Sequence, residues 1–280
     1  MDCEVVITRN GEPAVRDRVS GEVMHPMGAV TEANEVYVGP SRLEARLRDG
    51  GPDAPLVLFD VGLGAASNAI AAWKLSESLP SSARRLAIVS FENDLGALRL
   101  ALEPNHAEAF GFGQAAEGAH EAATALVRDG RWETPRTSWR LELGDFLSEL
   151  AEEPDASADI VFWDMFSASA NPILWSSATF AALRRVCRAG ATVHTYSAST
   201  STRSAFLLGG FAVGVGVPTG DRGETTVAAV RVQDLVSPLD ARWLERLERS
   251  SAPFPIDVPF EPKARRDSLA QIRQLPQFRT

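Results

Sequence analysis

Four apolar, strand-like runs in this chain lead into an acidic residue. The acids are Asp60 after Leu56–Phe59, Glu92 after Leu86–Phe91, Asp145 after Ser138–Leu143 and Gly144, and Asp164 after Ile160–Trp163. Parallel strands of an open α/β sheet end at one edge, and ligands of such sheets bind outside that edge. We therefore expect the four carboxylates to line a single ligand site.

These positions suit the parts of a nucleoside-containing ligand. The Glu92 carboxylate can accept hydrogen bonds from both hydroxyls of a ribose, and Asp145 after Gly144 suits the exocyclic amino group of adenine. Asp60 and Gly62 would lie at the amino-acid end of the ligand. S-adenosylmethionine combines these groups and has no phosphate to clamp. The glycine turn also lacks the lysine of a phosphate-binding loop, so we expect S-adenosylmethionine as the cofactor.

A glycine turn links the first of these strands to a helix. Gly62-Leu63-Gly64 allows the backbone to turn sharply, and the helix that opens near Ser67-Asn68 offers free N–H groups to a ligand. A Gly-x-Gly pair also occurs in ordinary strand-to-helix turns, so this motif alone predicts only a crossover of an α/β sheet. The expected cofactor-binding residues are Asp60, Gly62, Gly64, Asn68, Glu92, Gly144, Asp145 and Asp164.

The order of strands and helices predicts an α/β fold. We expect a seven-stranded, Rossmann-like sheet of the class I methyltransferase type that ends in an antiparallel hairpin. Its last two strands are Phe211–Val217 and Thr225–Val232, joined by a turn around Gly220-Asp221-Arg222-Gly223. A dinucleotide-binding dehydrogenase sheet normally ends parallel, so this hairpin separates the two classes.

Three regions are expected along the chain. Residues 1–50 form an N-terminal extension with a β-hairpin at Asn10-Gly11 and a further β-like segment at Glu35–Val38. Residues 51–235 form the methyltransferase core, with a helical insertion near 104–138. Residues 236–280 form a C-terminal tail with a helix near Leu239–Leu247 and another near Arg265–Gln274.

Composition limits the class of protein. The 280 residues are 45% hydrophobic and carry a formal net charge of −9, which argues against a globally basic, nucleic-acid-binding surface. Cys3 and Cys187 are too few for a disulfide scaffold and lack metal-ligand spacing. The acidic start lacks the features of a secretory signal, and no apolar run is long enough to span a membrane. We expect a cytoplasmic protein without a metal and without a membrane partner.

The stretch after the fourth strand resembles a known family. Asp164, Phe166, Asn171-Pro172 and Trp175 match the acid-x-Phe and Asn-Pro-x-x-Trp pattern of the MnmC-type methyltransferase domain. Proteins of this type make 5-methylaminomethyl-2-thiouridine in tRNA. Further similarities are Gly62-x-Gly64 with Asn68, the 195–199 stretch with Arg203, Gly210-Phe211, Met24-His25-Pro26 and Glu32-Ala33. The resemblance runs from about residue 5 to residue 232.

The resemblance implies S-adenosylmethionine-dependent methylation of the aminomethyl group of a wobble-uridine derivative in tRNA. Asp164 would accept a hydrogen bond or a proton from the amine, Phe166 and Trp175 would wall the pocket, and Asn171 would orient the loop or the substrate. The expected catalytic residues are Asp164, Phe166 and Asn171, and the expected substrate residues are Trp175, Arg203 and His25. The chain resembles the stand-alone form without the oxidase domain, so no flavin is expected.

Two differences from the family pattern leave the substrate open. The family usually has a proline where Ala168 or Ser169 stands, and a basic turn where this chain has Gly220-Asp221-Arg222-Gly223-Glu224. One alternative is an N-methyltransferase of a small-molecule or peptide amine. Another is a catalytically silent, S-adenosylmethionine-binding scaffold, against which the four aligned carboxylates argue.

Overall fold

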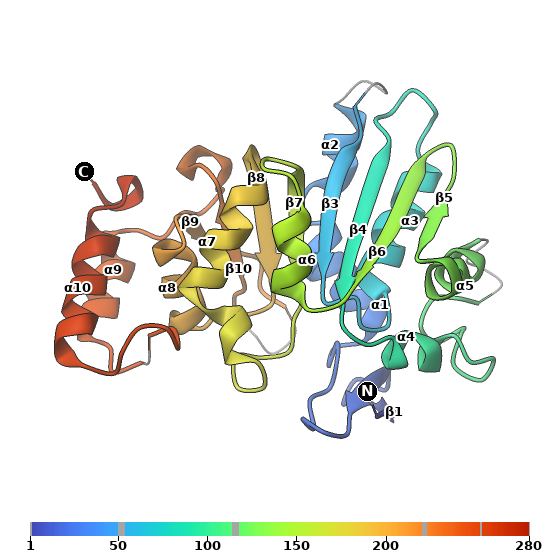
Figure 1. Cartoon of the computed structure of the whole chain (residues 1–280), viewed down its shortest axis with the longest axis horizontal. Coiled ribbons are helices and arrows are strands. Elements are labelled where there is room, and N and C mark those ends of the chain that lie inside the picture. The colour runs from blue at the N-terminus through green and yellow to red at the C-terminus, as the bar shows by residue number, and fades with distance from the viewer. Residues whose placement is uncertain (1, 50–53, 114–117, 220–222, 253, 280) are drawn as a thin grey trace. The chain divides into compact units, whose positions relative to one another are not determined.

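The computed structural model describes residues 2–49, 54–113, 118–219, 223–252 and 254–279 (Figure 1). The chain divides into two compact units. Unit 1 comprises Met1–Glu149 and Ile160–Asp164, and unit 2 comprises Leu150–Asp159 and Met165–Thr280. The predicted boundary at residues 50 and 51 lies outside the described residues.

Unit 1 is built on five neighbouring strands in the order β5-β6-β4-β3-β7. The strands are β3 (Leu56–Val61), β4 (Leu86–Glu92), β5 (Arg131–Glu133), β6 (Thr137–Leu143) and β7 (Ala158–Trp163). Strands β3, β4, β6 and β7 pair in parallel, as expected, and β3, β4 and β6 lie side by side in Figure 1. β5 is an additional short edge strand, antiparallel to β6, in a region that the sequence predicted as the end of the helical insertion.

The parallel strands form the interior of unit 1. Every residue of β7 is buried, and β3 is buried except at Val57. A strand covered on both faces needs a continuous apolar run, which is the pattern in the sequence. Helix α3 (Ser67–Ser78) contacts β4 and β6 and buries Ile70 and Trp73. The turn and helix expected after β3 are therefore present.

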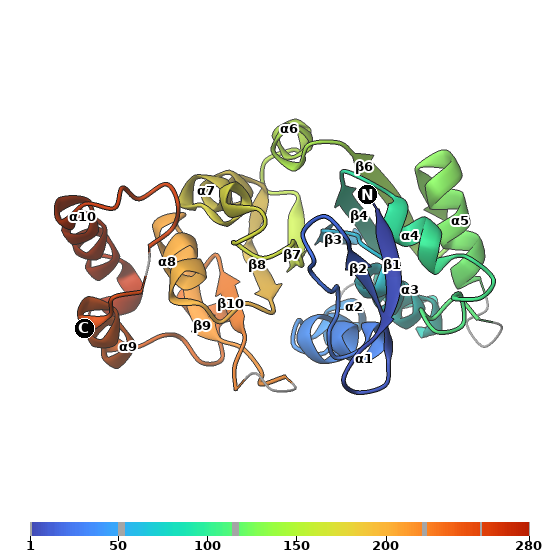
Figure 2. The same ribbon diagram turned by 90° about the horizontal axis from the view of Figure 1, so that it is seen from below.

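The N-terminal region combines the expected hairpin with unexpected helices. β1 (Cys3–Ile7) and β2 (Pro13–Asp17) pair antiparallel around the Asn10-Gly11 turn, and β1 lies beside α4 (Gly96–Ala101), as Figure 2 shows. The β-like assignment of Glu35–Val38 is wrong, because Ala33–Val38 forms the π-helical turn η1. This turn contacts α3 and buries three successive apolar residues, so tertiary packing overrides their β propensity.

The described residues before β7 contain four further α-helices. α5 (Ala119–Asp129) confirms the helical part of the insertion and contacts β5 and β6. The other helices in this part of the chain are α1 (Ala29–Glu32), α2 (Leu43–Arg48) and α6 (Phe146–Glu152). α1 and α2 both contact α3, which therefore holds the N-terminal helices in unit 1.

Unit 2 contains the antiparallel part of the fold. Its strands follow the order β8-β10-β9, with β10 antiparallel to both neighbours. The strands are β8 (Cys187–Thr195), β9 (Ala212–Val215) and β10 (Thr226–Ala229). The expected terminal hairpin is therefore present. Helices α7 (Ser177–Val186) and α8 (Thr200–Leu208) contact each other, and Phe180 stacks on Phe206 with ring centroids 3.7 Å apart.

The C-terminal tail is an integral part of unit 2. Its helices and turns are η3 (Val232–Asp234), α9 (Ala241–Arg249), α10 (Pro262–Arg273) and η4 (Pro276–Phe278). The Gln277 amide exchanges hydrogen bonds with the backbone of Val213, and the backbone N–H of Leu239 donates to Val213 O. These contacts attach the tail to β9. No helix in the described part of the chain is both long and apolar enough to cross a bilayer.

Candidate active site

The ends of the parallel strands in unit 1 lie in register. Val61 at the end of β3 pairs with Phe91 of β4 and Trp163 of β7, and its carbonyl accepts from the N–H of Asp164 at 2.9 Å. Glu92 pairs with Leu143, and the Glu92 carbonyl accepts from the N–H of Gly144 at 2.9 Å. The expected acids therefore lie along one edge of these strands.

Asp164 is the centre of the polar contacts at this edge. Tyr37 Oη donates to Asp164 Oδ1 at 2.6 Å, and Asn68 Nδ2 donates to Asp164 Oδ2 at 2.8 Å. His25 Nε2 lies 3.5 Å from the same Oδ2. The Asp164 side chain is only 11% exposed, so these neighbours hold a carboxylate that is largely removed from water. Three separate elements meet at this one side chain.

Each partner of Asp164 is placed by its own local structure. Asn68 is in the first turn of α3, and Tyr37 lies on η1 with its ring 5.4 Å from that of Phe162. His25 has a positive φ of 52°, which is uncommon for a residue with a Cβ. Asn68 and His25 were predicted as site residues from the sequence, whereas Tyr37 was not. No spacing pattern marks Tyr37, because its role depends on η1 lying against α3.

Glu92 holds the glycine turn in place. Glu92 Oε2 accepts from the N–H of Gly64 at 2.9 Å, while Oε1 accepts from the N–H groups of Asn93 and Asp94 at 2.8 and 3.3 Å. Burial raises the pKa of Glu92, and these three N–H groups oppose that effect. Gly64 has a φ of +52°, and a Cβ there would lie 3.3 Å from Met24 Sδ. The turn therefore favours glycine at this position.

Asp60 is the most deeply buried of the four acids. It is 1% exposed, and its Oδ2 accepts from Ser90 Oγ at 2.8 Å, while Ser90 Oγ accepts from Trp139 Nε1 at 2.9 Å. Burial raises the pKa of Asp60 to about 7. The charges of Asp164 and Glu92 act in the same direction, and the hydrogen bond from Ser90 acts against it. Asp60 is therefore about half protonated near neutral pH.

Asp145 has a local structural partner. Its Oδ2 accepts from both the N–H and the Oγ of Ser148, each at 3.0 Å, which is a helix N-cap contact at the start of α6. Asp145 also follows Gly144, whose N–H is bonded to the carbonyl of Glu92. The cap orients one carboxylate oxygen of Asp145 toward the helix.

The unpaired acceptors of unit 1 fit S-adenosylmethionine. Asp60 Oδ1 and Asn68 Oδ1 are buried without a hydrogen-bond partner among the described residues. Such acceptors need donors, and the ligand offers ammonium and hydroxyl N–H and O–H groups. Positive φ angles at Gly62 and Gly64 keep side chains out of the turn beside them. In the described residues, no group of three His, Cys, Asp or Glu side chains is placed to hold a metal ion.

The Asn171–Trp175 loop belongs to unit 2 and is closed by its own contacts. Asn171 donates its N–H to the carbonyl of Ser167 at 2.9 Å, and Trp175 Nε1 donates to the carbonyl of Phe166 at 2.7 Å. Trp175 is 2% exposed and packs edge-on against Tyr196 at 5.9 Å, whereas Phe166 is half-buried. Trp175 therefore fixes the backbone that carries Phe166.

Arg203 is an interior residue of unit 2. Its side chain is 4% exposed and donates to Thr226 Oγ1, the Thr225 carbonyl and Glu224 Oε1 at 3.0–3.1 Å. These contacts hold α8 against the start of β10. The contacts of Arg203 seen here are structural, and its contact with a substrate stays a prediction. Residues 220–222 of the acidic hairpin turn lie outside the described residues.

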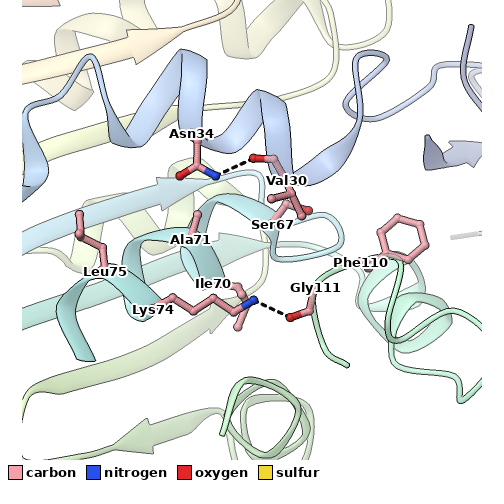
Figure 3. Close-up of a pocket in the computed structure, with 9 residues that line it drawn as sticks. All are labelled: Val30, Asn34, Ser67, Ile70, Ala71, Lys74, Leu75, Phe110 and Gly111. Carbon is pink, nitrogen blue, oxygen red and sulfur yellow. Dashed lines mark hydrogen bonds between the residues drawn. The ribbon is translucent and has the colours of Figure 1, made fainter. Parts of the chain in front are cut away.

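A separate pocket of about 310 Å³ lies on the outer face of α3 (Figure 3). α3 contributes Ser67, Ile70, Ala71, Lys74 and Leu75, and the other lining residues are Val30, Asn34, Phe110 and Gly111. Its polar groups are partly engaged, since Lys74 Nζ donates to the Gly111 carbonyl at 2.7 Å and Asn34 Nδ2 donates to the Val30 carbonyl at 2.8 Å. None of the predicted site residues lines it.

Comparison with known sequences agrees with the geometry in indicating an S-adenosylmethionine-dependent enzyme. Residues 117–231 match a family described as S-adenosyl-L-methionine-dependent methyltransferase. The chain is 30% identical over 234 residues to the tRNA 5-methylaminomethyl-2-thiouridine biosynthesis bifunctional protein MnmC of Methylibium petroleiphilum, covering 80% of this chain and 34% of that protein. It is 31% identical over 210 residues to MnmC of Pseudomonas aeruginosa, covering 73% and 31%. The chain thus spans about a third of the length of these relatives.

Comparison with solved structures extends the similarity to the whole chain. The structure of MnmC2 from Aquifex aeolicus matches with a TM-score of 0.72 at 26% identity, covering 98% of this chain and 86% of that one. Spermidine synthase from Thermotoga maritima matches with a TM-score of 0.51 at 11% identity, covering 99% and 81%, which is a likeness of fold alone. The expected class I methyltransferase fold is confirmed.

Proposed function

We propose that this chain, an S-adenosylmethionine-dependent methyltransferase, methylates the aminomethyl group of a wobble-uridine derivative in tRNA. The observation that carries this proposal is the Asp164 carboxylate, which accepts hydrogen bonds from the Tyr37 hydroxyl and the Asn68 amide at the edge where the parallel strands end. A fixed carboxylate is suited to an amine, because it can accept an N–H hydrogen bond and balance a positive charge. The similarity to MnmC proteins supports tRNA as the carrier of that amine.

The residues of unit 1 that would hold the cofactor are the strand-end acids and the glycine turn. Glu92 and Asp145 would take the ribose and adenine ends, and Asp60, Gly62 and Asn68 would take the amino-acid end. When bound, S-adenosylmethionine supplies a methyl group on a positively charged sulfur. The protein therefore has to align the acceptor nitrogen and accept its proton.

Asp164 has room for one more donor. A carboxylate offers about four lone-pair positions, and Tyr37, Asn68 and His25 approach three of them. The remaining position would accept a hydrogen bond from an N–H of the substrate amine. This bond would fix the orientation of the amine and hence the direction of its nitrogen lone pair.

His25 completes the surroundings of the Asp164 carboxylate. Its Nε2 lies 3.5 Å from Asp164 Oδ2, and its Nδ1 is buried without a partner among the described residues. A primary ammonium group must lose one proton before its nitrogen can attack. Because an Nε2–H that faces Asp164 acts as a donor, the Asp164 carboxylate is the group placed to take the proton that the amine releases.

The loop of unit 2 would contact the substrate. Phe166 would stack on a base of the substrate, and Asn171 would orient the loop that carries it. Trp175, which is buried, would act by holding the Phe166 carbonyl. These roles are assigned from the residue types and the local contacts within unit 2.

The test is transfer of radiolabelled methyl groups from S-adenosylmethionine to tRNA from cells that lack this modification. Normal tRNA serves as the substrate control, and a nucleoside digest identifies the labelled base. We expect label in a single wobble-uridine derivative, and its loss in Asp164→Asn with cofactor binding retained. Asp155→Asn, at an exposed carboxylate that pairs with Arg185, should transfer normally. Equal loss of transfer and cofactor binding in Asp164→Asn would contradict the assigned role.

A small cationic amine is the second candidate substrate. The net charge of −9 attracts a cation and repels a polyanion, which favours this reading over tRNA on electrostatic grounds. Transfer to polyamines or basic peptides, with none to tRNA, would establish it. Cofactor binding without transfer to any amine would instead indicate a silent scaffold.

A further inference from the structure

The C-terminal tail differs in charge from the rest of the chain. Residues 236–280 contain eight Lys and Arg against six Asp and Glu, a net charge of +2. The chain as a whole carries −9, so residues 1–235 carry −11. Of these two parts of the chain, the tail is therefore the one whose net charge attracts a polyanion.

One residue of the tail, Asp257, is bonded to the start of α7, which follows the Asn171–Trp175 loop in the sequence. Asp257 Oδ1 accepts from the N–H of Ser177 at 3.1 Å, and Asp257 Oδ2 accepts from Ser177 Oγ at 2.6 Å and the N–H of Ala178 at 3.0 Å. Ser177 is the first residue of α7 and follows Trp175 by two positions. The hydrogen bonds from Ser177 and Ala178 hold the pKa of Asp257 below its usual value despite the opposing effect of burial, so the anchor is anionic at neutral pH.

A second anchor fixes the start of α10. The Arg265 guanidinium donates to the carbonyls of Ala252, Ser250 and Leu247 and lies 4.6 Å above the ring of Phe254. These bonds join α10 to the end of α9, the two C-terminal helices labelled in Figure 1. The 256–266 segment is therefore held at both Asp257 and Arg265, and its backbone is not a free tail.

The exposed side chains of this anchored segment include one aromatic ring and two cations, with Glu261 between them in the sequence. Phe260 is fully exposed, and Lys263 and Arg266 are exposed one turn apart at the start of α10. A phenyl ring left fully in water forgoes the free energy of burial. An exposed ring and two exposed cations within seven residues of one anchored segment are the side-chain types that bind single-stranded RNA, because bases stack on the ring and phosphates pair with the cations.

We propose that Phe260, Lys263 and Arg266 form a contact surface for the unpaired loop of the tRNA substrate. This inference rests on the proposed function and deepens it, since it names the part of the chain that holds the RNA. It also accounts for how a chain with an acidic last hairpin turn retains a polyanion: the positive contacts lie on the anchored 256–266 segment. The loop is favoured over a duplex because only unpaired bases can stack on a side chain.

The test compares binding of a synthetic anticodon stem-loop RNA by full-length variants, measured by fluorescence anisotropy at several salt concentrations. We expect Phe260→Ala to weaken binding about tenfold, since base stacking is of this order. Phe260→Tyr should restore binding and Phe260→Leu should not. Lys263→Ala with Arg266→Ala should weaken binding. The slope of the logarithm of the binding constant against the logarithm of the salt concentration should become shallower by about 0.7 per lost phosphate contact.

The matched control is Arg242→Ala with Arg246→Ala. It removes the same charge from exposed positions on α9 of the same tail, and binding should change less than twofold. If both double variants weaken binding equally, net charge alone is responsible and the proposed surface is wrong. If wild-type protein methylates tRNA while Phe260→Ala binds the stem-loop as wild type does, the surface is wrong and the function stands. If wild-type protein neither binds nor methylates tRNA, the proposed function itself fails.

Discussion

Tyr37 and Asp164 are 127 residues apart in the chain, yet the Tyr37 hydroxyl donates a 2.6 Å hydrogen bond to the Asp164 carboxylate. The bond joins the π-helical turn η1 to the residue that follows β7. Asn68 at the start of α3 binds the other oxygen. This arrangement fixes the orientation of the carboxylate before a substrate amine arrives, which is the preorganisation that efficient group transfer requires.

Removal of the Tyr37 hydroxyl is expected to slow methyl transfer. Tyr37→Phe keeps the buried ring and removes one hydrogen bond to a charged group, worth about 1.5–3 kcal/mol. We expect kcat to fall between about tenfold and a hundredfold, with the Kd for S-adenosylmethionine within twofold of wild type. Steady-state kinetics and calorimetry measure the two quantities. An unchanged kcat would show that the remaining neighbours of Asp164 suffice.

The buried Asp60 is expected to make stability depend on pH. With a folded-state pKa of about 7, Asp60 keeps its proton while the unfolded chain, with a pKa near 3.9, has already lost it. The folded state binds more protons between these values, so this group lowers the free energy of unfolding as pH rises from about 4 to 7. Asp60→Asn removes that dependence.

Urea denaturation at a series of pH values measures this effect. The free energy of unfolding of Asp60→Asn minus that of wild type should increase from about pH 4 to pH 7 and then level off. The full change is on the order of 4 kcal/mol, from about three pKa units. Asp155→Asn, at an exposed carboxylate, provides the control series. A difference that stays constant across this range would contradict the raised pKa.

Substitution of Gly64 is expected to affect both stability and cofactor binding. Alanine at a φ of +52° costs about 1–2 kcal/mol, and its Cβ would approach Met24 Sδ at 3.3 Å in the turn held by Glu92. Gly130→Ala is the matched control, because Gly130 has a φ of +69° and open space around its Cα. Thermal denaturation should register both variants, whereas calorimetry should register weaker S-adenosylmethionine binding only for Gly64→Ala. Weaker cofactor binding in both would point to general destabilisation.

The indole of Trp175 is expected to affect substrate binding by holding the backbone of Phe166 in place. Trp175→Phe leaves the Phe166 carbonyl without its 2.7 Å donor and frees the backbone that carries the Phe166 ring. We expect KM for the methyl acceptor to rise about tenfold, the effect of one hydrogen bond of roughly 1.4 kcal/mol, with cofactor affinity retained. Trp243→Phe, at a buried tail tryptophan that stacks on Phe278, is the control and should keep the wild-type KM. Equal changes in both variants would assign the effect to unit 2 stability.

The sequence by itself determined the strands and the order of the acids at their ends. A strand buried on both faces requires a continuous apolar run, so Leu56–Phe59 and Ile160–Trp163 could be recognised from composition alone, and parallel pairing then places Asp60 and Asp164 at one edge. The hairpin at Asn10-Gly11 was predicted from its turn residues, because turn chemistry is a local property. The resemblance of residues 164–175 supplied the family.

Only the tertiary structure decided which of these residues touch. Glu35–Val38 has a β-like composition but turns helically against α3, which brings Tyr37 to Asp164. Arg203 matches a family position, yet its guanidinium is enclosed by residues 224–226. Such contacts depend on the packing of elements distant in the chain, and packing energies are not encoded in local periodicity. The exposed Phe260 likewise lies on a fixed segment only because the nearby Asp257 accepts hydrogen bonds from the first residues of α7.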